Sequence, residues 1–357
     1  MIRKITAKIK PISYDIDIGS SVFETLPQKI ESLSPDKTII VVSVKVFELW
    51  RDYLEKVLNK ISYVDLLLME DGEENKNYQY AENFFNKFLL KGLSRKSLVI
   101  AIGGGVVGDF AGLLAAFFMR GISIIHVPTT LLAMVDSSLG GKVAVNLKVG
   151  KNIIGAFHQP KYILSDILFL KTLPINEWQN GLAEILKHGL IGEQKTLEIL
   201  KENDLNSIQK KEIISELVYL SAAFKISIVE QDEKEGGLRS ILNFGHTIGH
   251  AFESFFEYKI SHGTAVALGI FFALKISAQK GYLPKKSVAE VNQILNKYEL
   301  LNKNLKINSA QIINHMKYDK KNFAGQINFV LLEKIGSPLY NQKVDESLLK
   351  KILEPIL

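Results

Sequence analysis

The chain has 357 residues, of which 47% are hydrophobic and 23% are charged, and it contains no cysteine. This composition is typical of a globular protein long enough for two domains, and it excludes a disulfide framework and thiolate metal sites. The net charge of +6 comes from lysines spread along the chain. Since no basic cluster is interleaved with aromatic residues, we expect no nucleic-acid partner.

No membrane segment is expected. The amino-terminal residues lack the long apolar core of a signal peptide, and glycines and Asp109 interrupt the most apolar run, 98–119. A charge at the centre of a membrane helix is costly, so this run is interpreted as a buried strand followed by a buried helix. We therefore expect a cytoplasmic protein that does not associate with membranes.

Strand-like and helix-like patterns alternate in the first half of the chain. The expected strands are 14–18, 38–43, 63–69, 98–102, 122–127 and 162–165, and the expected helices are 45–59, 76–91 and 105–118. Such alternation predicts an α/β domain with a parallel sheet covered by helices. Leu173-Pro174 marks the expected boundary, so the first domain is predicted over 1–174.

Helical periodicity dominates the second half. The expected helices are 176–190, 193–203, 207–230, 241–257, 262–280 and 286–298, and one β-rich piece follows at 326–332. These patterns predict a mostly helical domain over 175–357. The cleft between the two domains is then the expected active site.

A glycine-rich turn follows the apolar strand 98–102. Gly103, Gly105 and Gly108 have the G-x-G-x-x-G spacing and open a helix. Backbone N–H groups and the helix N-terminus together favour a phosphate, so this turn predicts a nucleotide site, with a merely tight turn as the alternative. Asp109 is unexpected beside a pyrophosphate, and it suits ribose hydroxyl or nicotinamide amide groups better.

A second candidate binding segment is 142–161, where lysines stand among glycines and small apolar residues. This pattern differs from that of a solvated lysine-rich surface. We expect an anion-binding loop that carries Lys142, Lys151 and Asn152.

Histidines gather in the second half. His246 and His250 are four residues apart in NFGHTIGHAFE, His262 follows in SHGTAVALG, and Glu184 lies upstream in GLAEILKHG. A carboxylate with two or three imidazoles suits zinc, and three protein ligands with an open position are typical of catalytic zinc. Ordinary core or surface histidines are the alternative. The helical spacing alone makes His246 and His250 a ligand pair.

Several cationic and polar side chains stand in apolar surroundings. Lys187 is one helical turn after Glu184, Lys225 lies in AAFKISIVEQ, and Arg239 precedes Asn243 by one turn. Each alone is typical of a surface. Together with the lysines of 142–161 they predict a cationic pocket for a substrate with several negative charges, such as a phosphate and a carboxylate.

These motifs, in this order, resemble the 3-dehydroquinate synthase family of sugar-phosphate cyclases. The resemblance runs from about residue 39 to 330 and includes GGGVVGDFAG, VPTTLLAMVDSSLGGKVAVN, GKNIIGAFHQP, LKTLP, GLAEILKHG, EKEGGLRSILNFGHTIGHAFE and YDKK. It implies a Rossmann-like N-terminal domain, a helical C-terminal domain, NAD, and a divalent metal that is usually zinc, with cobalt as an alternative. The implied reaction converts 3-deoxy-D-arabino-heptulosonate 7-phosphate to 3-dehydroquinate and phosphate in the shikimate pathway, through transient oxidation, elimination, reduction and aldol closure.

The resemblance also implies individual roles. It makes Glu184, His246 and His262 the metal ligands, and His250 a pocket residue near the reacting proton and phosphate. The implied NAD residues are Asp71, Gly72, Glu73, Lys76, Gly104, Gly105, Val106, Val107, Gly108, Asp109, Thr129, Thr130, Lys142, Lys151, Phe169 and Thr172. The implied substrate and catalytic residues are Lys142, Asn152, Asp136, Lys187, Lys225, Arg239, Asn243, His250 and Lys320, with Arg120 reaching the phosphate across a homodimer interface.

Two positions depart from the family pattern. Val44 follows Ser43 where the family usually has Asp or Asn for the adenosine ribose, and Thr264 replaces the glutamate of H-G-E after His262. We expect one ribose hydrogen bond and one carboxylate that supports the metal site to be lost.

Three rival functions remain at this stage. The first is another sugar-phosphate cyclase, such as 2-deoxy-scyllo-inosose synthase, against which Lys225, Arg239, Asn243 and Lys320 argue because they suit a carboxylate-bearing substrate. The second is a glycerol-type NAD-dependent polyol dehydrogenase, and the third is a scaffold without activity, which the intact metal triad disfavours.

Overall fold

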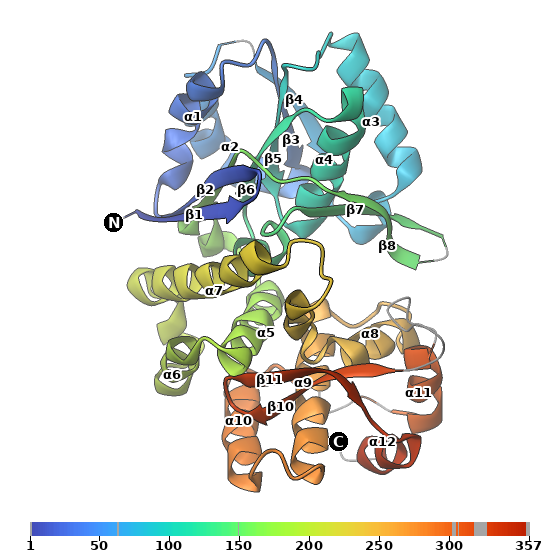
Figure 1. Cartoon of the computed structure of the whole chain (residues 1–357). Helices are drawn as coiled ribbons and strands as arrows, with labels where there is room; N and C mark the ends of the chain where they lie inside the picture. Colours follow the sequence, from blue (N-terminus) through green and yellow to red (C-terminus); the bar gives the residue numbers. More distant parts are fainter. Residues whose placement is uncertain are drawn as a thin grey trace. The chain divides into compact units, whose positions relative to one another are not determined.

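The computed structural model describes residues 2–62, 64–148, 150–301, 305, 307–317 and 327–354. The chain divides into two compact units, Met1–Pro174 and Ile175–Leu357. Each unit has its own arrangement of helices and strands (Figure 1).

The first unit is built on a seven-stranded sheet with the order β1-β2-β9-β6-β5-β3-β4. The antiparallel hairpin β1–β2 forms one edge, and every other pairing is parallel. The strands are β1 (Arg3–Ile9), β2 (Ile12–Gly19), β3 (Thr38–Ser43), β4 (Val64–Met69), β5 (Leu98–Gly103), β6 (Ser123–Pro128) and β9 (Tyr162–Asp166). The six predicted strands are confirmed, whereas β1 was missed.

Helices cover both faces of this sheet, as its continuous apolar strands require. Ile39 and Val41 of β3 pack with α3 (Tyr78–Leu90) and α4 (Gly105–Phe117) in one apolar core, whereas α2 (Val44–Leu58) packs against β3 and β4 outside that core and α1 (Leu26–Leu33) packs beside α2 (Figure 1). The three helices predicted for this half are confirmed, and α1 was missed. Short helical segments complete the unit: Val22–Thr25, Glu73–Asn75, Phe118–Arg120, Ala133–Ser137 and Ile167–Thr172.

The order of the strands locates a binding edge. From β3 the chain goes outward to β4, and then returns to β5 on the other side of β3 before continuing to β6. Ligands of open parallel sheets bind outside the carboxyl ends of the strands at such a reversal. Here that position lies beyond Ser43 and Gly103, which end β3 and β5.

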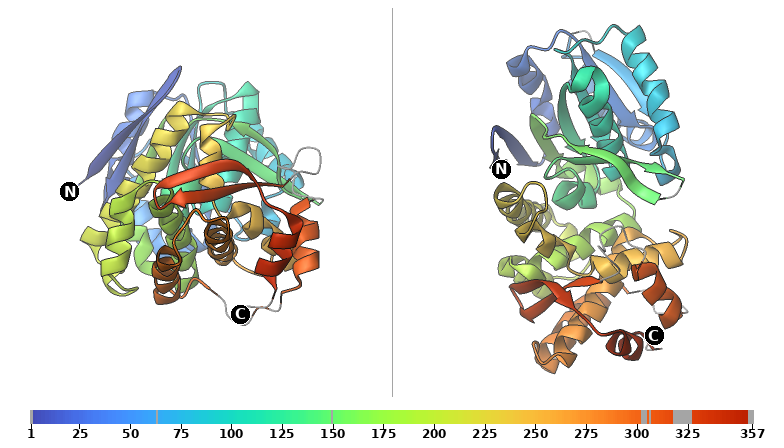
Figure 2. Two further views of the ribbon diagram at one scale, coloured as in Figure 1. Left: turned by 60° about the horizontal axis from the view of Figure 1, so that its bottom comes forward. Right: turned by 45° about the vertical axis from the view of Figure 1, so that its right-hand side comes forward.

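The segment 142–161, expected as a loop, is mostly an antiparallel hairpin of β7 (Lys142–Leu147) and β8 (Gly150–Phe157) (Figure 2). Val143 and Val145 of β7 are buried in the core beside α4. Their alternation with more exposed neighbours is a strand pattern, which the lysines and glycines of this segment concealed.

The second unit is mostly helical. Its helices are α5 (Ile175–Ile191), α6 (Gln194–Glu202), α7 (Lys211–Gln231), α8 (His246–Phe255), α9 (His262–Gln279), α10 (Lys285–Lys297), α11 (Ser309–Lys317) and α12 (Glu346–Leu353), with short turns at Ser207–Gln209 and Leu238–Asn243. The β-rich piece predicted at 326–332 is confirmed as β10 (Asn328–Lys334), which pairs with β11 (Ser337–Lys343). The sequence did not predict β11, α11 or α12.

The helix expected over 241–257 is interrupted. Gly245 has φ +80°, a left-handed conformation that glycine adopts readily, and it separates the turn Leu238–Asn243 from α8. A Cβ atom at Gly245 would lie 2.8–3.1 Å from Ile270 and Val266 of α9. The break therefore serves the close packing of α8 against α9.

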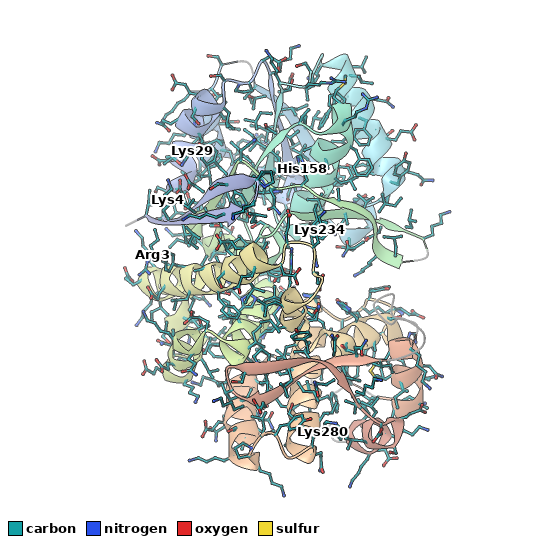
Figure 3. The ribbon with its side chains drawn as sticks, in the orientation of Figure 1. Arg3, Lys4, Lys29, His158, Lys234 and Lys280 are labelled. Atoms are coloured by element: carbon teal, nitrogen blue, oxygen red, sulfur yellow. The ribbon has the colours of Figure 1, made fainter. Side chains whose placement is uncertain are left out.

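Lysines of β1 and α1 form ion pairs with aspartates of β2. Lys4 and Lys29, labelled in Figure 3, each pair at 2.7 Å with an aspartate of β2, and Lys29 also lies over the ring of Tyr162.

In the part of the chain that is described, no helix is both long and apolar enough to span a membrane.

Candidate metal and nucleotide sites

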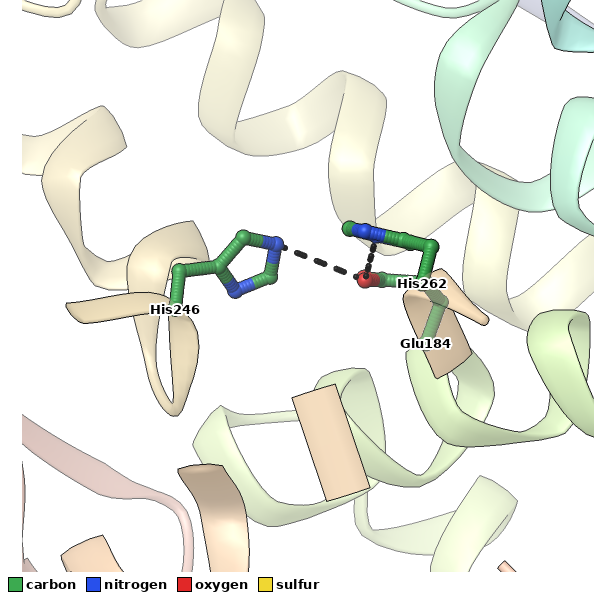
Figure 4. Close-up of side chains that lie close together, drawn as sticks. All are labelled: Glu184, His246 and His262. Carbon is green, nitrogen blue, oxygen red and sulfur yellow. Dashed lines mark hydrogen bonds and ion pairs between the residues drawn. The ribbon is translucent and has the colours of Figure 1, made fainter. Parts of the chain in front are cut away.

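Three potential metal ligands from different helices converge in the second unit. Glu184 lies on α5, and His246 and His262 are the first residues of α8 and α9. Their ligand atoms all lie within 4.8 Å of one another. Glu184 Oε1 is 3.4 Å from His246 Nε2 and 3.2 Å from His262 Nε2 (Figure 4). One carboxylate and two imidazoles are a suitable donor set for zinc.

Glycines allow the three helices to approach so closely. A Cβ atom at Gly269 would overlap the carbonyl oxygen of Gly245, and one at Gly249 would lie 3.0 Å from Ala265 O. A Cβ atom at Gly263 would overlap Asn180 of α5, one turn before Glu184. The Gly263 N–H donates to Asn180 Oδ1 at 2.9 Å, which joins the start of α9 to α5.

The outer nitrogen of each histidine has its own acceptor. His246 Nδ1 lies 3.2 Å from the carbonyl oxygen of Phe244, and His262 Nδ1 lies 3.2 Å from Glu253 Oε1. Both rings therefore direct Nε2 toward Glu184. A metal-binding imidazole is commonly held in this way by its second nitrogen.

The site is electrostatically unusual because Glu184 is fully buried beside Lys187. Burial alone would raise the pKa of Glu184, but the ion pair with Lys187 and the two histidines outweigh it and lower this pKa well below its usual range. Burial and the charge of Lys187 lower the pKa of His246. Burial also opposes a charged His262, but its hydrogen bonds to Glu184 and Glu253 raise its pKa to about 10.

His250 lies beside the cluster. Its ring centroid is 5.4 Å from that of His246, so the predicted shared helix face is confirmed. Yet among the described residues of this unit, the group of converging ligand atoms is Glu184, His246 and His262. The i, i+4 spacing alone predicted His246 and His250 as a ligand pair, whereas the ligand atom of His246 converges with those of Glu184 and His262.

Other predicted substrate residues of this unit are buried cations. Lys225 of α7 is 7% exposed and Arg239 is 2% exposed. Arg239 donates to the carbonyl oxygen of Glu233, and Asn243 Nδ2 donates to Glu235 Oε1 at 2.6 Å. Buried cations need anionic or strongly polar partners, and Arg239 has two within the chain, the carbonyl oxygen of Glu233 and the nearby carboxylate of Asp232. Lys320 lies outside the described residues.

In the first unit, the glycine-rich turn joins β5 to α4 as predicted. Gly104 is the N-cap of α4, and its lack of a side chain means that it cannot cap the first-turn N–H groups of Gly105, Val106 and Val107. A Cβ atom at Gly105 would lie 2.8 Å from Ser137 Oγ. The backbone is thus closely packed, and the helix N-terminus has no acidic residue in its first turn.

A buried lysine neutralises Asp109. Lys76, only 3% exposed, donates to Asp109 Oδ2 at 2.5 Å and to Asn152 Oδ1 at 2.7 Å. Asn146 extends this network, because its Nδ2 donates to Glu73 Oε1 at 2.8 Å and its Oδ1 accepts the N–H of Asn152, also at 2.8 Å. The carboxylate that was unexpected near a pyrophosphate therefore has a cationic partner.

Asp71 is fixed at the carboxyl ends of β3 and β4. Its two oxygens accept from Ser43 Oγ at 2.6 Å and from the N–H of Lys45 at 2.9 Å. Gly72 follows with φ +108°, a conformation that suits glycine. A carboxylate thus stands at this edge of the sheet although Val44 provides none.

The two threonines after β6 differ in their contacts. Thr130 Oγ1 accepts from Ala133 N at 3.2 Å, whereas Thr129 Oγ1 is buried with no hydrogen-bond partner within the described chain. Ser137 Oγ, beside Gly105, is likewise buried with no such partner there. Buried hydroxyls are nearly always hydrogen-bonded, so these two indicate a ligand or a water.

Phe169 and Thr172 lie on the turn Ile167–Thr172. Phe169 is 2% exposed and packs edge-on against Phe23 and Trp50, so its side chain belongs to a core. Thr172 Oγ1 accepts from Trp50 Nε1 at 2.8 Å.

The remaining predicted residues lie on different segments of the first unit. Lys142 pairs with Phe157 at one end of the β7–β8 hairpin, and Lys151 lies near the other end. Asp136 lies in the π-helical turn Ala133–Ser137, a kind of turn that is frequent at functional sites. Arg120 is exposed and has φ +68° after Met119 at φ +49°, so this short segment is conformationally strained.

Sequence reasoning missed Glu253 and Ser137. Glu253 stands three and seven residues after His250 and His246, a spacing that places all three on one helix face, so a signal was present. Ser137 gave no comparable signal, because its position beside Gly105 depends on the tertiary fold.

Known proteins are similar to this chain in both sequence and fold. The model of the 3-dehydroquinate synthase N-terminal family matches residues 66–180, and that of its C-terminal family matches residues 181–322. A 3-dehydroquinate synthase of Halalkalibacterium halodurans is 42% identical over 95% of this chain and 94% of its own. One of Thermoanaerobacter sp. is 43% identical over 92% of this chain and 93% of its own.

A solved structure of 2-deoxy-scyllo-inosose synthase, complexed with carbaglucose-6-phosphate, NAD⁺ and Co²⁺, is 29% identical with a TM-score of 0.89 over 98% of this chain and 99% of that one. A 2-epi-5-epi-valiolone synthase from Streptomyces hygroscopicus with bound NAD⁺ and Zn²⁺ has a TM-score of 0.87 over 97% of both chains and, at 23% identity, shares the fold. The matches to both family models and the near-full-length relatives establish that this chain belongs to the 3-dehydroquinate synthase family.

Proposed function

We propose that this chain, as an enzyme of the phosphorus–oxygen lyase type, converts 3-deoxy-D-arabino-heptulosonate 7-phosphate to 3-dehydroquinate and phosphate. The observation that carries this proposal is the convergence of Glu184, His246 and His262 within 4.8 Å in a chain of this family. A redox-assisted elimination requires both a metal and NAD, and the chain offers a suitable donor set for each.

The metal ligands are proposed to be Glu184, His246 and His262. Their fit to zinc or cobalt rests on two imidazole nitrogens and one carboxylate oxygen that already face one another. Three protein ligands leave a coordination position open for substrate oxygens.

The NAD site is proposed at the carboxyl edge of the sheet. The closely packed glycine turn before α4 suits a pyrophosphate, and Asp71 suits ribose hydroxyl groups. The buried hydroxyls of Thr129 and Ser137, which have no protein partner among the described residues, support a ligand at this position. The further proposed members of this site are Gly72, Glu73, Lys76, Gly104 to Asp109, Thr130, Lys142, Lys151, Phe169 and Thr172.

A metal held by Glu184, His246 and His262 would supply Lewis-acid polarisation of substrate hydroxyls, and NAD held at the carboxyl edge of the sheet would supply reversible hydride transfer without net change of the cofactor. The residues of the chain bind and orient the substrate. Lys187, Lys142 and Asn152 are proposed to neutralise the phosphate, with His250 positioned near the proton that is lost. Lys225, Arg239 and Asn243 are proposed to bind the carboxylate end, with Asp136 and Lys320 as further substrate residues.

The proposal includes a homodimer in the cytoplasm, in which Arg120 reaches the phosphate of the neighbouring subunit. The exposure of Arg120 and of the preceding Met119, at 39%, supports an interface at this strained turn. Light scattering and phosphate release are measured for the unaltered protein and for Arg120→Ala. We expect the variant to remain a dimer but to lose phosphate release.

The test of the activity is phosphate release from 3-deoxy-D-arabino-heptulosonate 7-phosphate with NAD and zinc, with NADH absorbance followed in the same sample. Phosphate release without net NADH is expected. Release only from glucose 6-phosphate would instead assign the chain to inosose formation, and net NADH without phosphate would indicate a polyol dehydrogenase.

Variants sharpen this test. His246→Ala and Lys142→Ala are both expected to abolish phosphate release while the protein still folds, as circular dichroism would verify. Near-normal rates in either variant would contradict the assignment of that residue.

A further inference from the structure

His262 lies between two carboxylates from different helices. Its Nε2 is 3.2 Å from Glu184 Oε1 on α5, and its Nδ1 is 3.2 Å from Glu253 Oε1 on α8. Glu253 is largely enclosed, with a side chain that is 13% exposed. One ring nitrogen therefore faces the proposed metal ligands and the other faces Glu253.

His246 provides an internal comparison. Its Nδ1 lies 3.2 Å from the carbonyl oxygen of Phe244, which can only accept, so Nδ1 donates and the lone pair is on Nε2. A carboxylate at the same place on His262 would keep the proton on Nδ1 once a metal displaces the proton from Nε2, and this is the same tautomer. The two imidazoles are thus held alike, His246 by the main chain and His262 by a side chain that can be substituted.

Thr264 does not supply this function. Its hydroxyl lies 3.0 Å from Ser261 Oγ, and its N–H donates to the same oxygen at 3.2 Å, in the N-cap of α9. Glu253 reaches His262 from α8, three residues after His250. A carboxylate therefore stands beside His262 even though the sequence departure at Thr264 removes one.

We infer that Glu253 is a positioning residue of the metal site. It accepts the Nδ1 hydrogen of His262 and holds Nε2 toward the position shared with Glu184 and His246. This inference rests on the proposed metal site, but it does not depend on the identity of the substrate. Partners of this kind typically change metal affinity about 10- to 100-fold when they are removed.

Zinc affinity measured by chelator competition tests the inference without NAD or substrate. Glu253→Ala is expected to lower the affinity about 10- to 100-fold. Glu253→Gln is expected to lose less, because its amide oxygen can still accept from Nδ1. The visible absorption of Co²⁺-loaded protein should change in both variants, since the orientation of one ligand changes.

Glu257→Gln is the matched control. Glu257 follows α8, is exposed, and pairs with Lys259 at 2.7 Å. The control should bind zinc like the unaltered protein, and the melting temperature of all metal-free variants should stay within a few degrees of it.

Zinc affinities within twofold of the unaltered protein in both Glu253 variants would overturn the inference. A lowered melting temperature in metal-free Glu253→Gln with unchanged zinc affinity and Co²⁺ spectrum would also overturn it, because the role would then be structural. If the unaltered protein binds zinc and Glu253 matters for it, but no phosphate is released, the proposed reaction fails and the inference stands.

Discussion

The two units build their candidate sites from different parts of the chain. In the first unit the backbone makes most of the site, at the carboxyl ends of the strands and at the glycine turn whose N–H groups begin α4. In the second unit side chains make it, and glycines serve only to bring α5, α8 and α9 together around Glu184, His246 and His262. A site made of main-chain groups tolerates many different neighbouring side chains. A site made of side chains depends on the position of each ligand atom.

The largest effect on stability is expected at Lys187, the buried partner of Glu184. Lys187→Met leaves a buried carboxylate without this cation and should lower the free energy of unfolding of the metal-free protein by about 3–5 kcal/mol. Zinc should restore part of the loss, since it supplies positive charge at the same carboxylate. Urea unfolding with and without zinc measures both.

Lys195→Met is the control for this prediction. Lys195 forms an ion pair with Glu216 at 2.6 Å, but its side chain is 59% exposed. Because exposed pairs contribute at most about 1 kcal/mol, little change is expected. Equal losses of unfolding free energy in Lys187→Met and Lys195→Met would show that burial of Glu184 does not determine the effect.

The next largest effect should come from Gly269→Ala. Its Cβ would overlap the carbonyl oxygen of Gly245, so α8 and α9 must separate, at a cost of about 3 kcal/mol or more. Gly108→Ala in α4 is the comparison from the other unit, because its Cβ would meet His126 only at an ordinary 3.7 Å. Thermal unfolding should show a loss in Gly269→Ala and none in Gly108→Ala, and the reverse order would refute the packing argument.

A smaller effect is expected where the first unit does depend on side chains. Lys76→Met removes the cation shared by Asp109 and Asn152 and should weaken NAD binding about 10-fold or more, by leaving a carboxylate uncompensated beside the proposed pyrophosphate. Calorimetric titration with NAD measures this. The double variant Lys76→Met/Asp109→Asn should recover part of the affinity, and a double variant no better than Lys76→Met would count against the electrostatic explanation.

An effect that appears only in acid is the pH dependence at His126, which is buried on β6. Burial, helped by His158, lowers its pKa from 6.5 to about 4. The unfolded chain thus binds a proton below about 6.5 that the folded chain does not bind until about 4, so this contribution to stability is lost as the pH falls between these values. His126→Gln should lose less stability across that window, by up to about 1.4 kcal/mol per pH unit. If the unaltered protein and His126→Gln lose stability in parallel as the pH falls, the prediction is wrong.

The sequence predicted the elements whose patterns are local and strong. The apolar strands β3 and β5 and the long helices α5 and α9 are examples, because their burial is written as unbroken or periodic apolar residues. Strand β1 was missed because its lysines and exposed residues reflect an edge position. The β7–β8 hairpin was missed because its burial depends on α4.

The candidate site could be predicted only in part. Spacing indicated a metal site in the second unit, but it paired His246 with His250, because helix geometry does not reveal which other helices approach. His262 and Glu184 are 78 residues apart and meet through tertiary packing, which includes the contact of Gly263 with Asn180. The partnership of Lys76 with Asp109 likewise arises from tertiary structure, 33 residues apart.

The most direct test of the proposed lyase reaction, in which NAD is reduced and reoxidised within one turnover, is a turnover count with limiting cofactor. Zinc-loaded protein freed of nucleotide is mixed with one equivalent of NAD per chain and an excess of 3-deoxy-D-arabino-heptulosonate 7-phosphate, and phosphate and NADH are both measured. We predict phosphate in large excess over the NAD supplied, no accumulated NADH, and neither product in Glu184→Gln. Phosphate release that stops at one equivalent with matching NADH, or that persists in Glu184→Gln, would show that the proposed reaction or the proposed metal site is wrong.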